Sequence, residues 1–246
     1  MSLYKHIKAS IIAAFLLVAL PGCAIEQATV VAPEGLLNVL GPFPGFTPVA
    51  LPGDWAIDKD GDLNESQLQV ITKEGVPALQ VINGEDSFVV VRRTDAMMLA
   101  TPFLSWSWFI EPPSTSGYHP VRIVVGFYGG DPASPSRGSE PLRWVGNALP
   151  AHDRAISFTW SETALQRGTL TKPDKGNKRA APRYTVRGGR ENAGSWWLET
   201  VDLSDVYRRV WPKDDGGNTR IVFIGIAAAG GRTPAPAHVS GILLSR

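Results

Sequence analysis

Apolar and polar residues alternate in short runs along most of the chain, and glycine, proline, aspartate and asparagine separate these runs. The clearest run is 104–110, where the leucine, both tryptophans and the isoleucine fall on one face of an extended chain and both serines on the other. Strands that are buried on one side have this pattern. Ten runs predict β-strands, namely 67–72, 78–82, 87–92, 103–110, 121–128, 155–160, 183–186, 195–201, 219–226 and 238–244.

One short helix is predicted between the last strands. Ser204 is an acceptable N-cap, and Val206, Tyr207 and Val210 fall on one face at helical spacing before Pro212 ends the helix. No segment keeps a helical period beyond about three turns. The pattern therefore predicts an all-β sandwich or barrel with one short helix.

A positively charged start and an apolar run mark the N-terminus. Lys5 and Lys8 precede the run 9–20, which as a helix would span about 18 Å against the roughly 30 Å of hydrocarbon in a membrane. The run is too short for a stable membrane span, so residues 1–22 are predicted to be a signal peptide.

The signal peptide ends in a cysteine. The motif LPGC at 20–23 resembles the lipobox of bacterial lipoproteins, which implies a lipid on Cys23, and Ala24 in the next position favours the outer membrane, facing the periplasm. The alternative is ordinary cleavage after Ala24, which would give a soluble periplasmic or secreted protein. Because Cys23 is the only cysteine, an intramolecular disulfide is excluded.

The processed chain divides into a tether and one domain. Residues 23–52 hold five prolines, which favour extended chain, so this segment is predicted to be a tether and residues 53–246 a single domain. Removal of residues 1–22 leaves 22 basic and 23 acidic residues. This near-neutral balance gives no reason to expect a nucleic-acid partner, and membrane contact is expected through the lipid alone.

Several motifs occur in a characteristic order after Trp55. They are LSWSW at 104–108, RIVVGF at 122–127, FTW at 158–160, YRR at 207–209, IGI at 224–226 and SGIL at 240–243. In this order they resemble a secreted bacterial family of unknown function, domain of unknown function 3047. The resemblance implies an antiparallel β-sandwich of jelly-roll type and supplies no catalytic residues. The chain departs from the family at 117–120 and 228–231, where an acidic pair and an Asp/Asn-rich loop would be expected.

Residues 58–64, DKDGDLN, resemble the first half of a calcium-binding loop. The second half is missing, because Leu63 replaces the required glycine and Gln69 replaces the final carboxylate. We therefore expect a turn here and no cofactor, with a weak calcium site at Asp58, Asp60 and Asp62 as the alternative.

Positive charge is concentrated in residues 167–190, which hold eight basic residues and one acid. Such a segment predicts either a solvated loop or a patch that attracts anionic glycans, and aromatic rings would add stacking surfaces for sugars. We expect a non-catalytic envelope module that binds an anionic polysaccharide or another envelope protein. The expected ligand-binding residues are Arg122, Tyr128, Arg183, Arg187 and Trp197.

The sequence contains no catalytic motif of a common hydrolase, metalloprotease or nucleotide-binding enzyme. One alternative is a carbohydrate-active enzyme that uses a carboxylate pair from Glu162, Glu199 and Asp202. Another is a structural subunit that joins an envelope complex through a sheet edge. Three isolated histidines are expected on the surface or in loops, namely His119, His152 and His238.

Overall fold

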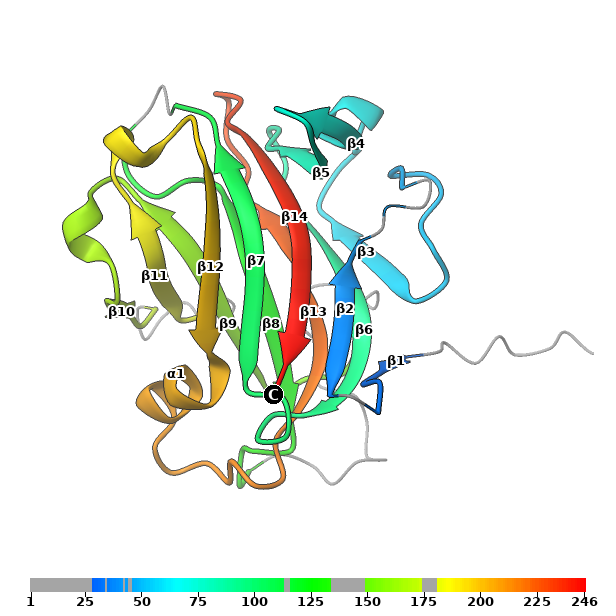
Figure 1. Cartoon of the computed structure of the whole chain (residues 1–246), viewed down its shortest axis with the longest axis vertical. Coiled ribbons are helices and arrows are strands. Elements are labelled where there is room, and N and C mark those ends of the chain that lie inside the picture. The colour runs from blue at the N-terminus through cyan, green and yellow to red at the C-terminus, as the bar shows by residue number, and fades with distance from the viewer. Residues whose placement is uncertain are drawn as a thin grey trace, which may run out of the picture.

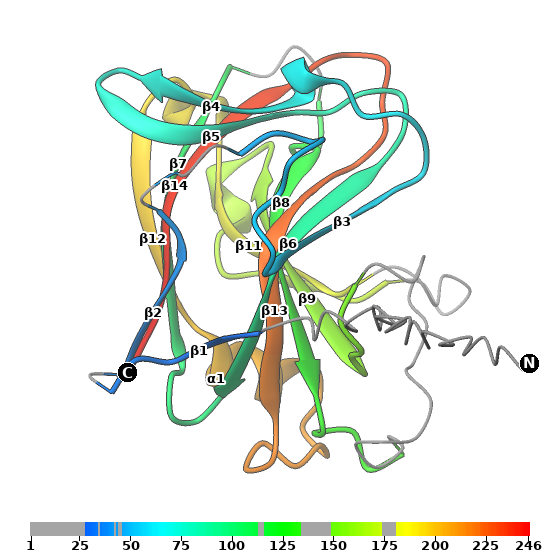
Figure 2. The same ribbon diagram turned by 90° about the vertical axis from the view of Figure 1, so that its right-hand side faces the viewer.

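The computed structural model describes residues 28–33, 35–41, 43, 46–112, 116–133, 149–173 and 181–246. In these ranges the chain forms two β-sheets packed face to face, with one α-helix at the lower end (Figures 1 and 2). The predicted β-sandwich with one short helix is confirmed.

The larger sheet has eight strands in the order β1-β6-β13-β8-β9-β11-β10, with β3 also paired to β6. Most pairings are antiparallel, whereas β1 with β6 and β9 with β11 are parallel. The strands are β1 (Thr29–Val30), β3 (Trp55–Lys59), β6 (Phe88–Met97), β8 (Val121–Tyr128), β9 (Arg154–Ser161), β10 (Leu170–Thr171), β11 (Arg183–Gly188) and β13 (Arg220–Ala228).

The smaller sheet has six strands in the order β12-β7-β14-β5-β4, with β2 also paired to β14. Strand β5 pairs with residues 236–239 of β14 and β2 with residues 242–245, on either side of a β-bulge. The strands are β2 (Leu36–Leu40), β4 (Leu68–Lys73), β5 (Val76–Ile82), β7 (Phe103–Ile110), β12 (Trp196–Asp202) and β14 (Pro236–Ser245).

Aromatic side chains fill the space between the sheets. Trp106 and Trp108 of β7 are fully buried, as their alternation with serine predicts, and they meet edge to face with ring centroids 5.6 Å apart. Trp108 lies 5.6 Å from Trp160, and Trp106 lies 5.9 Å from Phe158, both on β9 of the other sheet. These contacts hold β7 and β9 in fixed positions relative to each other.

The helix α1 spans Leu203–Val210 and follows β12 directly. Its N-cap is Asp202, whose side chain accepts a hydrogen bond from the Asp205 backbone N–H at 3.1 Å. Tyr207 packs its ring 5.1 Å from Phe127 and so attaches the helix to β8. Three single turns of 3-10 helix complete the described elements: η1 (Glu65–Gln67), η2 (Ala164–Gln166) and η3 (Arg190–Asn192).

The segment predicted to be a tether forms part of the domain. Strand β2 completes the lower half of the smaller sheet, and Leu37, Val39 and Leu40 are at most 2% exposed. Strand β1 adds to the edge of the larger sheet. The prediction of a tether as far as residue 52 is therefore wrong for 28–33 and 35–41, because the prolines stand between short strands and not within them.

A second apolar layer covers the outer face of the larger sheet. Phe223 of β13 and Tyr128 of β8 belong to it, and His152 packs its ring edge-on at 4.9 Å from Phe223. Tyr128 is only 8% exposed. The protein's own side chains therefore cover this part of the outer face.

No helix in the part of the chain that the structure describes is long and apolar enough to cross a membrane. The expected signal peptide and the expected lipid site at Cys23 lie outside the described residues.

Candidate functional site

Two arginines lie together on the outer face of the larger sheet, near the upper end of the sandwich. Strand β9 separates their strands: Ser157 pairs with Val124 of β8 on one side and with Arg183 of β11 on the other, and Arg122 is two residues from Val124. Both side chains leave the same face of the sheet. We call Arg122 and Arg183 the arginine pair.

Within the part of the chain that the structure describes, the arginine pair lacks a carboxylate partner. Burial and the charge of Arg183 lower the pKa of the Arg122 guanidinium, which nevertheless stays protonated. Among the described residues, no acidic side chain lies within ion-pair distance of either arginine. A partly buried guanidinium beside a like charge is costly unless an anion joins it.

An aromatic ring borders the arginine pair. The guanidinium of Arg183 lies 4.6 Å from the ring centroid of Tyr118, which belongs to the connection between β7 and β8. Tyr118 is partly exposed, so this surface combines positive charge with an aromatic face.

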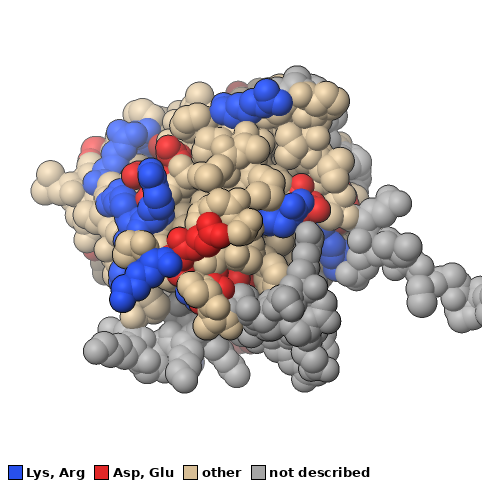
Figure 3. Space-filling model, turned by 90° about the horizontal axis from the view of Figure 1, so that it is seen from below, with Lys and Arg blue, Asp and Glu red and all other residues tan. Residues whose placement is uncertain are grey.

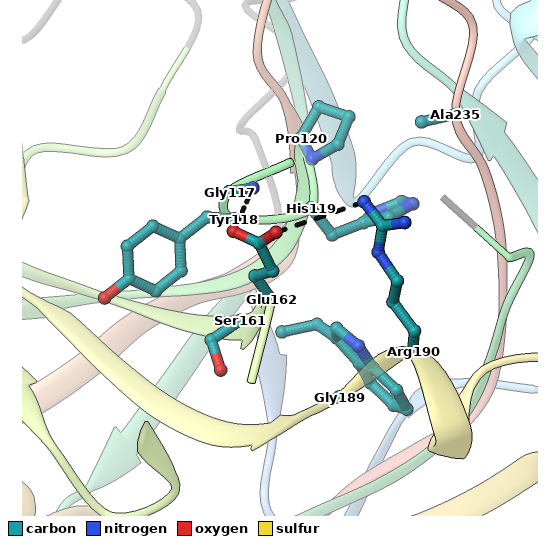
Figure 4. A pocket seen from close by; sticks show the side chains of 10 residues that line it. Gly117, Tyr118, His119, Pro120, Ser161, Glu162, Gly189, Arg190 and Ala235 are labelled. Atoms are coloured by element: carbon teal, nitrogen blue, oxygen red, sulfur yellow. Dashed lines mark hydrogen bonds and ion pairs between the residues drawn. The ribbon is translucent and has the colours of Figure 1, made fainter. Parts of the chain in front are cut away.

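A small pocket adjoins Tyr118 at the end of the sheets (Figure 4). We call it the polar pocket. The backbone N–H of Gly117 donates to Glu162 Oε2 at 3.0 Å, and Arg190 Nη2 lies 4.0 Å from Glu162 Oε1. The ring of Tyr118 points away from Arg190, so the carboxylate of Glu162 lies between the two. The lining residues come from four connections and the end of β9: Gly117, Tyr118, His119, Pro120, Trp160, Ser161, Glu162, Gly189, Arg190 and Ala235.

His119 is the buried member of this pocket. Its Nδ1 accepts a hydrogen bond from the Val121 backbone N–H at 3.2 Å, and burial lowers its pKa to about 4. The ring is therefore neutral at pH 7 and carries its proton on Nε2. That nitrogen is buried and has no hydrogen-bond partner among the described residues. A neutral donor without a partner among the described residues therefore lies beneath the wall of the pocket.

Two of the expected ligand-binding residues face the interior. Arg187 of β11 donates from Nε to Glu199 Oε1 at 2.5 Å and stacks 3.9 Å from the ring centroid of Trp197. Trp197 in turn donates from Nε1 to the carbonyl oxygen of Asn192 at 2.7 Å. Glu199 also accepts from Trp108 Nε1 at 3.2 Å and is 3% exposed. This cluster joins the two sheets and leaves little surface for a ligand.

The five expected residues therefore divide into three places. Arg122 and Arg183 lie together on the outer face, whereas Arg187 and Trp197 lie in the cluster between the sheets. Tyr128 shares the outer face with Arg122 but lies six residues along β8, roughly 20 Å away, and is buried.

The three carboxylates of the enzymatic alternative also lie apart. Glu162 lines the polar pocket, and Glu199 pairs with Arg187. Asp202 is the last residue of β12 and caps α1, at the end of the sandwich away from the pocket. Each has a separate structural partner.

The Asp-rich segment after β3 forms local contacts. Asp58 lies within β3, Asp60 accepts a hydrogen bond from Ser87 Oγ, and Asp62 lies 3.9 Å from Lys59 Nζ. Among the described residues, no group of three or more His, Cys, Asp or Glu side chains is arranged to hold a metal ion.

The lower end of the sandwich differs from the pocket end because its charges are paired. Lysine, arginine and acidic side chains lie side by side there (Figure 3). Arg154 contacts Asp131 at 2.6 Å and Asp214 at 2.9 Å, and Arg208 lies 3.9 Å from Asp205. Pairing of this kind reduces attraction for an external anion.

Sequence reasoning missed three residues of the polar pocket: Tyr118, His119 and Arg190. The three isolated histidines were expected on the surface or in loops. His119 and His152 do lie in connections and His238 lies in β14, but each is at most 6% exposed. The available signal was the segment 117–120, which departs from the pattern of the family it resembles.

The fold and the site define a β-sandwich domain with a basic, aromatic surface beside a small polar pocket. The chain belongs to the family described as protein of unknown function DUF3047, whose sequence pattern matches residues 57–238. No curated protein matches the chain.

Several solved structures are similar in architecture. The family 11 carbohydrate-binding module of the cellulase Lic26A-Cel5E from Clostridium thermocellum is 10% identical with a TM-score of 0.40, over 88% of this chain and 96% of that one. Endoglucanase 3 of family GH12 from Trichoderma harzianum is 9% identical with a TM-score of 0.41, over 73% and 82%. The K3 adhesin domain of Lys-gingipain from Porphyromonas gingivalis is 12% identical with a TM-score of 0.36, over 85% and 98%. Likenesses this distant say nothing about what this chain binds.

Proposed function

We propose that this protein is a non-catalytic envelope module that binds an anionic polysaccharide through the arginine pair and Tyr118. The observation that carries the proposal is the placement of Arg122 and Arg183 on one face, without a carboxylate partner among the described residues. Carboxylate or phosphate groups of a glycan would neutralise both guanidinium groups, with short charge-assisted hydrogen bonds.

The positions of the carboxylates favour binding over hydrolysis. A glycosidase needs two carboxyl groups facing each other across the substrate, roughly 5 to 9.5 Å apart. Glu199 already forms an ion pair with Arg187, and Asp202 already caps the N-terminus of α1. Glu162 alone borders the polar pocket among these three.

The proposed location is the cell envelope, with a lipid on Cys23 after removal of residues 1–22. Polymers of the envelope surface carry carboxylates and phosphates, so such a module would meet anionic ligands there. Binding to another envelope protein is the alternative partner.

A titration of the purified protein with polygalacturonate tests the proposal. We expect the double variant Arg122→Gln and Arg183→Gln to bind at least tenfold more weakly at about 0.05 M salt, because each lost charge-assisted contact is worth about 1.5 kcal/mol or more. Wild-type affinity should fall as salt increases, since ions screen exposed charges.

The matched control is Arg208→Gln, which removes one exposed arginine of α1 at the other end of the sandwich. This variant should bind like the wild type. Equal affinity of the double variant and the wild type, or no binding of the wild type at low salt, would contradict the proposal. Release of sugar fragments by the wild type would favour the enzymatic alternative.

A further inference from the structure

We infer that the polar pocket is a subsite for a sugar hydroxyl group, so that the complete site recognises a glycan with a free hydroxyl near its anionic group. This inference rests on the proposed function and specifies what the ligand must contain besides negative charge. Three observations support it: the 4.0 Å gap between Glu162 and Arg190, a His119 nitrogen without a partner among the described residues, and the small free volume beside them.

Glu162 and Arg190 face each other without a full hydrogen bond. Their closest nitrogen and oxygen atoms are 4.0 Å apart, beyond hydrogen-bond distance, and the side chains are 47% and 59% exposed. The other oxygen of Glu162 is already held by the Gly117 N–H, which fixes the carboxylate in place. Glu162 Oε1 can therefore accept and Arg190 can donate. A hydroxyl group, which both donates and accepts, complements this arrangement.

His119 adds a neutral donor to the same pocket. Its Nε2–H has no partner among the described residues, and its position is fixed because Nδ1 accepts from the Val121 N–H. A buried donor favours an acceptor that carries no counter-charge, such as a hydroxyl oxygen or a water molecule.

The free space beside these side chains is small. Its volume is about 10 Å³, which is room for about one water-sized group such as a hydroxyl. A hydroxyl group that enters it would take the place of a water molecule.

Tyr118 connects the pocket to the arginine pair. Tyr118 lines the pocket beside Gly117, and its ring points away from Arg190 (Figure 4). The guanidinium of Arg183 lies 4.6 Å from the centroid of this ring. A sugar ring lying against Tyr118 could place a hydroxyl group in the pocket and an anionic group on the arginine pair.

The decisive experiment compares two polyanions on the variant Glu162→Gln. Polygalacturonate offers carboxylates and sugar hydroxyls, whereas poly-L-glutamate offers carboxylates and no hydroxyl groups. The glutamine keeps an oxygen for the Gly117 N–H but removes the negative charge. We expect polygalacturonate to bind at least fivefold more weakly, and poly-L-glutamate to bind equally or slightly more tightly because a repulsive charge is gone. Opposite responses to one substitution separate hydrogen bonding from simple electrostatics.

The matched control is Glu191→Gln, which removes an exposed carboxylate from η3, next to the pocket but outside its lining. It should not weaken binding of polygalacturonate. A second variant, His119→Phe, removes the Nε2 donor and should weaken polygalacturonate binding at least threefold while poly-L-glutamate binding stays unchanged. Its melting curve shows whether the fold persists, and Glu162→Gln decides the question if it does not.

The two proposals fail in different ways. If Glu162→Gln changes both affinities equally, the hydroxyl subsite is wrong while the arginine pair still binds anions. If the wild type binds neither polymer at low salt, the proposed function itself fails.

Discussion

Arg187 of β11 and Glu199 of β12 form an ion pair, 2.5 Å between Nε and Oε1, that joins the two sheets at one open edge of the sandwich. At the opposite edge, Arg92 of β6 donates to the carbonyl oxygens of Asn38 at 2.5 Å and Val39 at 3.0 Å, both within β2 of the other sheet. An arginine therefore connects the sheets on each side of the aromatic core.

The ion pair should stabilise the fold. Glu199→Ala would leave Arg187 buried without a counter-charge, which costs about 3 kcal/mol or more. For a domain of this size the melting temperature should fall by roughly 6 to 12 °C, measured by circular dichroism. Glu191→Ala, at an exposed position, is the control and should melt like the wild type. A melting temperature unchanged by Glu199→Ala would mean that the pair contributes nothing to the fold.

Gly225 should tolerate no side chain. It lies in β13 between β6 and β8, and a Cβ atom there would overlap the carbonyl oxygen of Val90 on the neighbouring strand. Because backbone cannot move aside within a sheet, Gly225→Ala should cost about 3 kcal/mol, seen as a lower midpoint in urea. Gly53→Ala is the control, since no atom lies within 4 Å of the added methyl group. Equal midpoints for the two variants would contradict the packing described for β13.

Stability should decrease in mild acid through His119. Burial places its folded-state pKa at about 4, below the ordinary value of 6.5, so the unfolded chain takes up the proton first as the pH falls. The contribution of neutral His119 to the free energy of unfolding is fully present above pH 6.5 and is lost progressively as the pH falls toward 4. Between pH 7 and pH 5 the loss is about 2 kcal/mol.

Unfolding in urea at both pH values measures this loss. His119→Gln should be less sensitive to pH than the wild type, although His152 and His238, whose pKa values burial also lowers, keep part of the dependence. An identical pH dependence in variant and wild type would show that His119 is not buried as a neutral ring.

Removal of the N-terminal strands should destabilise the domain severely. A chain starting at Gly53 lacks Leu37, Val39, Leu40 and Phe46, each at most 3% exposed. Burial of four such side chains contributes roughly 6 to 12 kcal/mol, comparable to the whole stability of a typical domain. Thermal unfolding should show no cooperative transition, whereas a chain starting at Ala28 should melt like the full-length protein. A cooperative transition in the shorter chain would restore the interpretation of residues 23–52 as a tether.

Strand alternation predicted the core of the fold well. The pattern in 104–110 placed Trp106 and Trp108 inside, and the short helix follows from Val206, Tyr207 and Val210. Strands β1, β2, β3 and β10 were missed because each is short and lies among prolines, glycines or charged residues. Their pairing depends on neighbours distant in the sequence.

The face of the sheet on which each side chain lies was harder to predict. Simple alternation places Arg183 and Arg187 on the same side of one strand, but the register shifts between Thr185 and Arg187 and turns Arg187 inward. Trp197 was expected to bind a ligand, but it faces the interior with Glu199. There Arg187 stacks on the Trp197 ring and pairs with the Glu199 carboxylate. A one-residue irregularity in β11 therefore separated Arg187 from Arg183.

The pairing of β1 with β6 also limits how far the protein could reach from a membrane. Thr29 is fixed in the sheet, six residues after Cys23, and six extended residues cover only about 20 Å. With a lipid on Cys23, that edge of the sandwich would lie near the lipid headgroups. A flexible tether of thirty residues would instead have allowed a distance of about 100 Å between the lipid and the domain. Strand β1 lies toward the end that carries α1, away from the polar pocket (Figure 1). A protein anchored in this way would stand on the bilayer and present its upper loops to polymers in the surrounding space.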